Sequence, residues 1–325
     1  MRYAPAVGIT VEELASENFV VIEKRRVILK AVLEARGLNA TQYRLMLLLA
    51  FAPPQGLRMQ EIAEAAHLKN NIVSTGVDRL ETLGYAVRTT GSRDGRSRVV
   101  RLTSCGEAQL HAVQSSLINE MNAAFNPDAN PQLAELLGRG IVDGASIQGL
   151  WNPEILKEFA TSANLLTVDL VARKIESEVK ESLGISYNEL RVIQRLSEVG
   201  RPTRVSDLAE QLELPITTIT RAAQRLEKKG WLVRLASAIN RVAVFLDLTP
   251  AGREGAVALR EVLREVGGRV YWSNLQPSRV ATIRSVAAVY ADRMAAMDRA
   301  ARERDAGALS SLEPLPTLSS GAGKI

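Results

Sequence analysis

The sequence has few cysteines and histidines and no long apolar run, so it has little from which to build disulfides, metal sites or membrane spans. Its single cysteine, Cys105, excludes an internal disulfide and fits a reducing compartment. The two histidines, His67 and His111, have no second ligand at metal-binding spacing. The longest apolar run, 45–52, is far shorter than a bilayer-spanning helix, and the N-terminal segment lacks the apolar core of a signal peptide. We therefore expect a cytoplasmic protein with no metal, no cofactor and no membrane partner.

Motifs of catalysis are also missing, so an enzyme is not expected. The chain has no cysteine pair, no glycine loop of the kind that cradles phosphate and no nucleophile elbow. Charged residues at helical spacing usually form a solvated face. The 41 Lys and Arg residues outnumber the 36 Asp and Glu residues, and the isoelectric point is near 9.4. This modest excess suits an anionic partner if the charge is concentrated in one place.

What the sequence does contain is a long internal repeat. The stretch "GLNATQYRLMLLL" from Gly37 matches "GISYNELRVIQRL" from Gly184, and "VDRLETLGYAVR" from Val77 matches "AQRLEKKGWLVR" from Ala223. Later in the two copies, "LTSCG" matches "LTPAG" in the same order and spacing. The period is too long for a solenoid unit and has the size of a whole domain. We expect a domain at 1–150, a second at 151–304 and a disordered tail, rich in Gly, Ser and Pro, at 305–325.

Each copy is predicted to be mainly helical with a small β-wing. In the first copy, Thr10 and Glu13 have capping-box spacing and begin a long helix that ends at Gly37, with apolar residues on more than one face. A short helix, a tight turn and a second helix follow, and the Asp94-Gly95 step then predicts a β-hairpin. The fold class is therefore two tandem winged helix-turn-helix domains.

These elements together resemble the MarR family of transcriptional regulators. The resemblance is carried by the long first helix, by "RLE..G...R" at the end of the second helix of the motif, by the Asp-x-Arg wing and by "LT..G" before two further helices. It covers roughly residues 10 to 140 and 157 to 302. The resemblance implies that the first and last helices build a two-fold dimer, which holds two winged domains over successive major grooves. It also implies release from DNA by small aromatic or phenolic ligands.

Hydrogen-bonding side chains follow the outward face of the second helix of each motif. A helix in the major groove reads bases with its N-terminal part. In the first copy Val73, Val77 and Leu80 point inward by period, so the polar residues between them point outward. A merely solvated face is the alternative. The predicted DNA contacts are Asn71, Ser74, Thr75 and Arg79 in the first copy and Thr217, Thr218, Thr220, Arg221 and Arg225 in the second.

The first wing carries most of the excess positive charge, since 88–101 contains five arginines and one aspartate. Arginine suits both a narrow minor groove and phosphate oxygens. By the resemblance, Arg96 at the tip contacts the minor groove and Asp94 orients a neighbouring arginine. A hairpin kept soluble by its charge is the alternative. The predicted DNA contacts of this wing are Arg93, Asp94, Arg96 and Arg98.

The second wing departs from this pattern. It has Arg234 and Arg241 against Asp247, and its tip at 236–239 is small and partly apolar. We therefore predict unequal half-sites. The first copy uses both its helix and its wing, whereas the second relies mainly on its helix, with Arg241 as the wing contact.

Because one chain carries both domains, the two-fold interface of the family can form internally. The segments 11–36 and 154–183, with the helices after each wing, would build it. We expect an intramolecular pseudo-dimer that is a monomer in solution and binds a pseudo-palindromic operator in double-stranded DNA. A ligand pocket would lie where the dimerisation helices meet a winged domain. Interface salt bridges are the favoured alternative role for the arginines at repeat-equivalent positions there. The arginines that could bind an aromatic carboxylate are Arg26, Arg44, Arg173 and Arg191.

The function predicted from the sequence is sequence-specific, DNA-binding regulation of transcription, by a repressor that a small aromatic or phenolic ligand releases. The alternative is a winged-helix protein-interaction module in which one DNA-binding half has degenerated. Salt-dependent binding to promoter DNA discriminates between the two.

Overall fold

The computed structural model describes residues 14–90, 98–125, 131–147, 150–237, 243–272 and 277–316 of the 325-residue chain. Within these ranges the chain is mainly helical and has short antiparallel strands, which confirms the predicted fold class of two tandem winged helix-turn-helix domains. No helix in the described ranges is both long and apolar enough to cross a lipid bilayer.

Each of the two compact units of the chain combines one winged domain with helical segments from the other repeat. The first-repeat unit comprises Ile22–Val171 and Asn274–Ile283. The second-repeat unit comprises Met1–Val21, Ala172–Ser273 and Arg284–Ile325. The division predicted at residue 150 describes the repeat in the sequence and stays a prediction. Three helices contribute to both units, namely α1 (Ser16–Glu34), α8 (Ala160–Leu183) and α13 (Pro277–Leu309).

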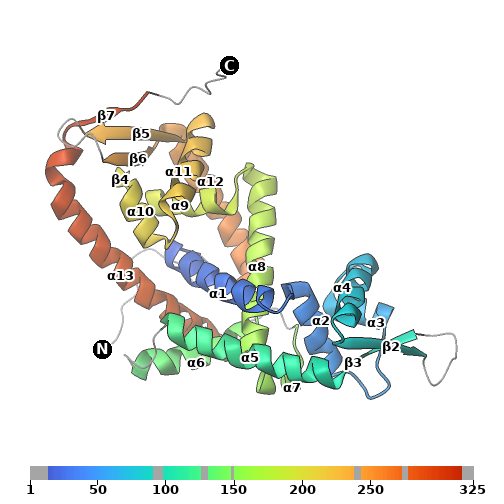
Figure 1. Ribbon diagram of the computed structural model, residues 1–325. Coiled ribbons are helices and arrows are strands. Elements are labelled where there is room, and N and C mark those ends of the chain that lie inside the picture. The colour runs from blue at the N-terminus through green and yellow to red at the C-terminus, as the bar shows by residue number, and fades with distance from the viewer. Residues whose placement is uncertain are drawn as a thin grey trace. The chain divides into compact units, whose positions relative to one another are not determined.

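The first-repeat unit contains a helix-turn-helix, a three-stranded sheet and the helices that support them (Figure 1). Helix α2 (Ala40–Ala50) begins at a capping box, in which Asn39 and Gln42 exchange hydrogen bonds between side chain and backbone. The elements in chain order are α2 (Ala40–Ala50), β1 (Leu57–Arg58), α3 (Met59–Ala66), α4 (Asn70–Thr82), β2 (Ala86–Thr90), β3 (Arg98–Leu102), α5 (Ser104–Phe125), α6 (Pro131–Ala145) and α7 (Pro153–Glu158).

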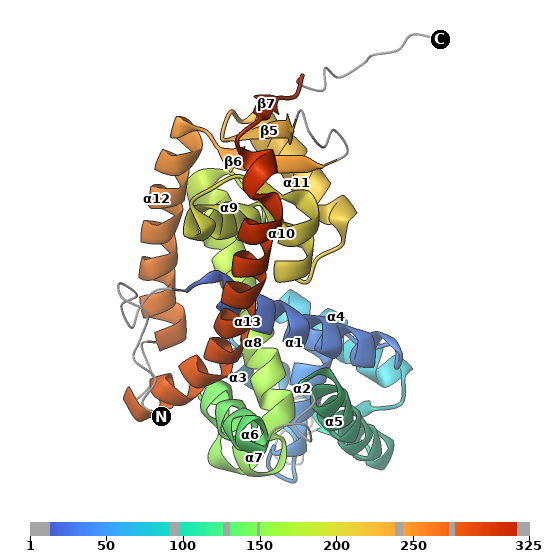
Figure 2. The ribbon, with the colours of Figure 1, turned by 90° about the vertical axis from the view of Figure 1, so that its left-hand side faces the viewer.

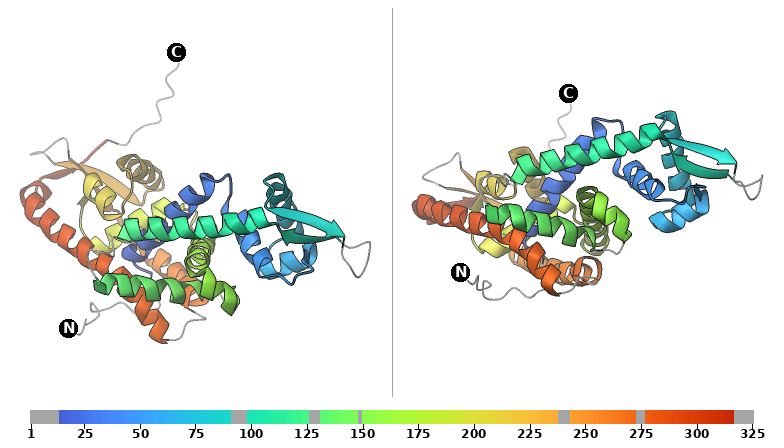
Figure 3. Two further views of the ribbon diagram at one scale, coloured as in Figure 1. Left: turned by 60° about the horizontal axis from the view of Figure 1, so that its bottom comes forward. Right: turned by 90° about the horizontal axis from the view of Figure 1, so that it is seen from below.

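The sheet of this unit confirms the predicted wing. Strands β2 and β3 pair antiparallel, from Ala86 opposite Leu102 to Thr90 opposite Arg98. Strand β1 pairs with the other edge of β3, so the order is β1-β3-β2. Helix α5 leads away from this sheet in both views of Figure 3. Its buried residues recur every three or four positions, which is the pattern of a helix with one face in the core: Leu110, Val113, Leu117, Met121 and Phe125.

The second-repeat unit has the same order of elements around its helix-turn-helix. Figure 2 shows two long helices, α12 and α13, beside it. The elements are α9 (Tyr187–Val199), β4 (Thr203–Arg204), α10 (Val205–Gln211), α11 (Ile216–Lys228), β5 (Leu232–Ser237), β6 (Val244–Leu248), α12 (Pro250–Val266), the π-helix η2 (Gly267–Trp272), α13 and β7 (Leu312–Pro314).

The prediction of a disordered tail at 305–325 is wrong for residues 305–316. Helix α13 continues to Leu309, and β7 then pairs antiparallel with β5, with Ser237 opposite Leu312 and Leu235 opposite Pro314. Composition alone missed this because the segment is ordered by distant partners: Asp305 is fully buried against arginines, and backbone hydrogen bonds hold β7. Residues 317–325 lie outside the described part of the chain.

Helix α1 confirms the prediction of apolar residues on more than one face. It begins at Ser16, and the predicted cap at Thr10 and Glu13 lies outside the described residues. Gly37 follows the helix with φ +65°, a left-handed conformation that favours glycine. Eight apolar residues of the predicted helix that lie on more than one face are buried, whereas Val27 is 58% exposed: Leu14, Phe19, Val21, Ile22, Ile28, Leu29, Val32 and Leu33.

Candidate nucleic-acid interface

The helix-turn-helix of each repeat is built in the same way. The turn after α3 contains His67 at φ 49°, and the turn after α10 contains the repeat-equivalent Glu213 at φ 48°. A left-handed residue at this point reverses the chain within a few residues. In the first copy Ile62 of α3 and Val73 and Val77 of α4 are fully buried, so the two helices pack through their apolar faces. The second helix of each motif therefore presents its opposite face outward.

The outward face of α4 carries the residues that the sequence predicted. Asn71, Thr75 and Arg79 are exposed, and Ser74 is partly exposed. The hydroxyl of Thr75 donates to the carbonyl oxygen of Asn71 at 3.0 Å, so its donor is used within the helix. Arg79 extends toward the loop after α1, where a Cβ on Gly37 would lie 3.4 Å from its Nη2.

Helix α11 presents a more basic outward face. Thr217, Arg221 and Arg225 are exposed, and Thr218 and Thr220 are partly exposed. Thr220 donates to the carbonyl oxygen of Ile216 at 2.9 Å. Arg225 lies 3.7 Å from the buried carboxylate of Glu189, whereas Arg221 has no ion pair or hydrogen bond among the described residues.

Sequence reasoning missed two exposed apolar residues on these helices. Ile216, the first residue of α11, is 56% exposed, and Ile72 in the first turn of α4 is 41% exposed. An isoleucine in such a position makes apolar contacts that can include a thymine methyl group. The signal for them in the sequence is an apolar side chain in the first turn that falls outside the buried period of the helix.

Of the predicted wing contacts, one lies in the described part of the chain. Arg98 begins β3 and is exposed, as is Arg101 on the same strand. Arg93, Asp94 and Arg96 in 91–97, and Arg241 in 238–242, lie outside the described residues.

Arg88, which the sequence places in the basic wing, forms ion pairs with α4, the second helix of the motif and hence its recognition helix. Its guanidinium lies 2.6 Å from Asp78 and also contacts Glu81, and its backbone N–H donates to Glu81 at 2.8 Å. The repeat-equivalent pair in the second copy is Arg234 with Glu227, at 2.9 Å. This ion pair explains the spacing "RLE..G...R" and removes Arg88 from the charge that the wing presents to a partner.

The shared "LT..G" motif joins each wing to the helix after it. Thr103 accepts a hydrogen bond from the N–H of Gly106 at 3.0 Å and donates to the carbonyl oxygen of Gly84 at 2.6 Å. Thr249 makes the equivalent bonds, at 3.0 and 2.7 Å. The glycine of the motif is required because a Cβ on Gly106 would overlap the carbonyl oxygen of Tyr85.

The second wing has an additional strand that the first lacks among the described residues. Strand β7 makes the sheet four-stranded, in the order β4-β6-β5-β7. The N–H of Leu315 donates to the carbonyl oxygen of Arg234 at 2.8 Å, and the Arg234 side chain donates to that of Pro316 at 3.2 Å. The outer edge of β5 is therefore covered by a later segment of the same chain, which places the exposed carboxylate of Glu313 beside this wing.

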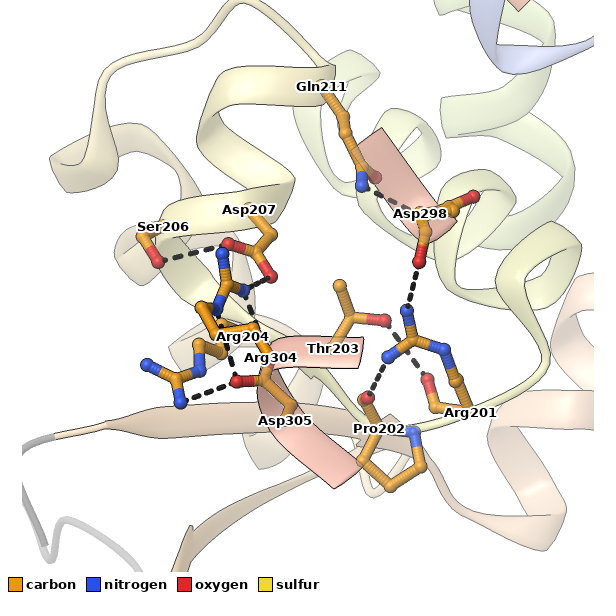
Figure 4. A network of polar contacts seen from close by, with 10 residues as sticks. All are labelled: Arg201, Pro202, Thr203, Arg204, Ser206, Asp207, Gln211, Asp298, Arg304 and Asp305. Atoms are coloured by element: carbon orange, nitrogen blue, oxygen red, sulfur yellow. Dashed lines mark hydrogen bonds and ion pairs between the residues drawn. The ribbon is translucent and has the colours of Figure 1, made fainter. Parts of the chain in front are cut away.

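A network of arginines and carboxylates fastens α13 to the second helix-turn-helix (Figure 4). Asp298 of α13 accepts from Arg195 at 2.5 Å and from Gln211 at 2.9 Å. About two turns further along α13, Asp305 lies 2.5 Å from Arg204. Although burial opposes it, hydrogen bonds from Arg304 and Arg204 hold the pKa of Asp305 below its usual range. Arg304 also pairs with Asp207 at 2.5 Å, so the network closes between α13 and α10.

In the first-repeat unit, polar contacts join helices from the two repeats. Arg26 of α1 lies 3.2 Å from Asp169 of α8 and 3.2 Å from Glu23. The hydroxyl groups of Tyr43 and Ser162 are 2.6 Å apart. Burial raises the pKa of Tyr43 above its usual range, so this hydroxyl remains protonated. The start of α8 is therefore an integral part of the first-repeat unit.

The four arginines predicted as ligand contacts have different environments. Arg26 is held by the two carboxylates just described, in line with the salt-bridge alternative. Arg44 is buried, and burial lowers its pKa; no ion pair to it is found among the described residues. Arg191 is fully buried and donates to the carbonyl oxygen of Leu212, whereas Arg173 is exposed on α8. Arg26 and Arg44 belong to the first-repeat unit and the other two to the second.

These features define the class of protein: a chain with two winged helix-turn-helix domains, each with an exposed second helix. Comparison with family models matches residues 36–97 and residues 185–241 separately to the MarR family. Two separate regions of the chain, one in each repeat, thus match the MarR family.

Two curated relatives are transcriptional regulators of Bacillus subtilis (strain 168). The chain is 33% identical over 86 residues to the uncharacterized HTH-type transcriptional regulator YpoP. The matched segment covers 26% of this chain and 60% of YpoP. The chain is 32% identical over 101 residues to the HTH-type transcriptional repressor MdtR. The matched segment covers 30% of this chain and 63% of MdtR. The matched segments span less than two thirds of either relative.

Among solved structures, the chain is similar to Sco3205, a MarR family transcriptional regulator from Streptomyces coelicolor in complex with DNA. The identity is 17%, the match covers 44% of this chain and 89% of that one, and the TM-score is 0.39.

Proposed function

We propose that the protein is a sequence-specific DNA-binding transcriptional regulator, and specifically a repressor that a small aromatic or phenolic ligand releases. The observation that carries the proposal is that both repeats present an exposed recognition helix, with hydrogen-bonding side chains opposite the buried face. The contacts predicted from the sequence are the residues through which it would act. The regulators among its curated relatives support this function.

Mobility-shift titration with the DNA upstream of the protein's own gene tests DNA binding. We expect a discrete complex whose affinity falls as the salt concentration rises, because Lys and Arg side chains displace counterions from phosphates. A protein-interaction module would show no sequence-selective complex at any salt concentration. That alternative gains support from β7, which covers the edge of the second wing, but the exposed Arg221 and Lys228 of α11 favour DNA.

We further propose that one chain acts as a pseudo-dimer on a pseudo-palindromic operator. Its support is that each compact unit already contains helices of both repeats, as the Arg26–Asp169 ion pair illustrates. Sedimentation velocity should show a monomer in solution and a complex of one chain with one operator duplex. A stable dimer of chains would contradict the proposal.

Arg44 is the strongest of the four arginines as a ligand contact, because it is buried and no ion pair to it exists among the described residues. Calorimetric titration with benzoate, a simple aromatic carboxylate, tests this assignment. Replacing Arg44 by Met should weaken benzoate binding, whereas Arg26→Met removes a guanidinium already held by Asp169 and should leave it unchanged. Equal effects of the two substitutions would exclude Arg44 as a specific contact.

A further inference from the structure

We infer that the two recognition helices read different bases, with Asn71 of α4 binding an adenine and Arg221 of α11 binding a guanine in the major groove. This inference rests on the proposed DNA-binding function and adds the base that each helix recognises. It implies that the operator halves differ where the helices contact them, and not only where the first wing reaches.

Asn71 is the residue of α4 best placed to read a base. It is exposed near the helix N-terminus and has no side-chain hydrogen bond among the described residues. Two outward neighbours are committed elsewhere: Thr75 donates to the backbone at 3.0 Å, and Asp78 lies 2.6 Å from Arg88. A carboxamide presents a donor and an acceptor side by side, which matches the N7 acceptor and N6 donor of adenine.

In α11 the corresponding role falls to Arg221, which occupies the repeat position of Thr75. It lies one turn after Thr217 on the face opposite the buried Ile219 and Ala223. Arg225 is close to Glu189, but the guanidinium of Arg221 has no carboxylate partner among the described residues. A guanidinium with its donors unoccupied matches the two acceptors of guanine, O6 and N7, in a bidentate contact.

The charges of the two copies are arranged in opposite ways, which supports this division. On α4 the acidic Asp78 and Glu81 outnumber Arg79, so the excess positive charge of the first copy lies in its wing. On α11 the positions of Thr75 and Thr82 are taken by Arg221 and Lys228, both exposed. The second wing has an uncharged tip at 236–239 and Glu313 beside it. In the second copy, helix α11 therefore supplies the attraction for DNA that the wing supplies in the first.

Selection from a pool of random 30-base-pair duplexes is the first test, with wild-type protein and with the Asn71→Ala and Arg221→Ala variants. The wild type should enrich a site with two non-identical halves. Arg221→Ala should lose a guanine preference in one half only, and Asn71→Ala should lose an adenine preference in the other. A perfectly palindromic site, or a variant that changes both halves alike, would overturn the inference.

Base analogues then test the contacts in the enriched duplex. Replacing the assigned guanine by 7-deazaguanine removes N7, one of the two acceptors, and we expect the wild-type affinity to fall by about fivefold, which lies within the about 1 to 3 kcal/mol that a whole bidentate contact supplies. The same replacement should not weaken the Arg221→Ala protein further. The adenine and Asn71 should show the same dependence with 7-deazaadenine. Additive losses would show that the residue and the base do not touch.

Two further variants separate base reading from charge and from folding. Arg221→Lys keeps the charge but not the planar fork, so it should bind DNA with a weaker guanine preference than the wild type. Lys228→Ala removes a charge at the end of the same helix and should weaken binding to all sequences alike. A guanine preference as strong in Arg221→Lys as in the wild type would refute the planar bidentate contact. If the wild type enriches no sequence at all, the proposed function fails together with this inference, whereas enrichment without the two base preferences refutes the inference alone.

Discussion

At the scale of single residues, the first turn of α1 contains a carboxyl group whose protonation depends on its neighbours. Burial, followed by the nearby carboxylate of Glu198, raises the pKa of Glu17 to about 7. The N–H of Ser16 donates to Glu198 at 3.0 Å, so the two acidic residues meet where α1 begins. Arg195 and Arg284 favour the charged form but do not outweigh burial. At neutral pH, a large fraction of Glu17 is therefore still protonated.

This raised pKa predicts a pH dependence of stability. An unperturbed Glu titrates near 4.5, so between that pH and about 7 the folded state holds the Glu17 proton more tightly than the unfolded state. Its contribution to stability is fully present below about pH 4.5 and is lost as the pH rises through about 7. Replacing Glu17 by Gln should remove this loss and raise the thermal midpoint at pH 8. The measurement is a series of melting curves from pH 5 to pH 8.

The control for this prediction is Glu303→Gln, a substitution at an exposed position of α13 in the same unit. In this variant the thermal midpoint should change with pH as steeply as it does in the wild type. A Glu17→Gln protein with an unchanged slope would show that Glu17 does not titrate in this range.

At the scale of elements, close packing between each wing and the helix after it limits which residues are tolerated. Gly252 in the first turn of α12 lies so close to Trp231 that a Cβ would overlap its carbonyl oxygen. Gly307, late in α13, has no atom within 4 Å of the position where a Cβ would be. The two glycines lie in the same unit, so they form a matched pair.

We expect opposite effects from alanine at these two positions. Gly252→Ala should lower the free energy of unfolding by about 1 to 3 kcal/mol, because the helix start must move away from Trp231. Gly307→Ala should raise it, by at most about 1 kcal/mol, because alanine is the better helix former. Urea denaturation followed by circular dichroism measures both, and a neutral Gly252→Ala protein would contradict the close approach.

Strand β7 gives a second prediction at this scale. Ending the chain after Ser311 removes the strand that pairs with β5, and the backbone of β5 then gains an open edge. Hydrogen exchange measured by mass spectrometry should become faster in peptides that contain 232–237. Peptides that contain 86–90 of the first wing serve as the internal control and should not change. Equal exchange in β5 before and after truncation would show that β7 does not protect it.

At the scale of the whole molecule, the two DNA-binding halves are expected to contribute unequally. Arg96 and Arg241, the predicted contacts of the two wings, should differ in effect because only the first wing is strongly basic. Arg96→Ala should reduce operator affinity several-fold more than Arg241→Ala, most clearly at low salt. Mobility-shift titrations of the two variants on one operator measure the difference. Equal losses would rule out the predicted asymmetry of the wings.

The sequence predicted those parts of the molecule that depend on local pattern. The buried period of α4 and the hairpin of the first wing follow from spacing within a few residues. The network on α13 could not be predicted in this way, because Arg195 and Asp298 are 103 positions apart and each alone is an ordinary charged residue. Likewise, the sequence shows Arg88 as wing charge, and only the fold pairs it with Asp78 and Glu81.

The interleaving of the repeats sets an order of events during synthesis on the ribosome. The first turns of α1 belong to the second-repeat unit, where Ser16 bonds to Glu198 and Phe19 packs edge-on against Tyr187. These turns therefore emerge long before their partners and must wait with apolar side chains uncovered, while the segment after Ile22 can already associate with the first winged domain. The interval during which nascent chains are most exposed to aggregation, or to chaperones, thus ends only after α9, which carries both partners, has been translated.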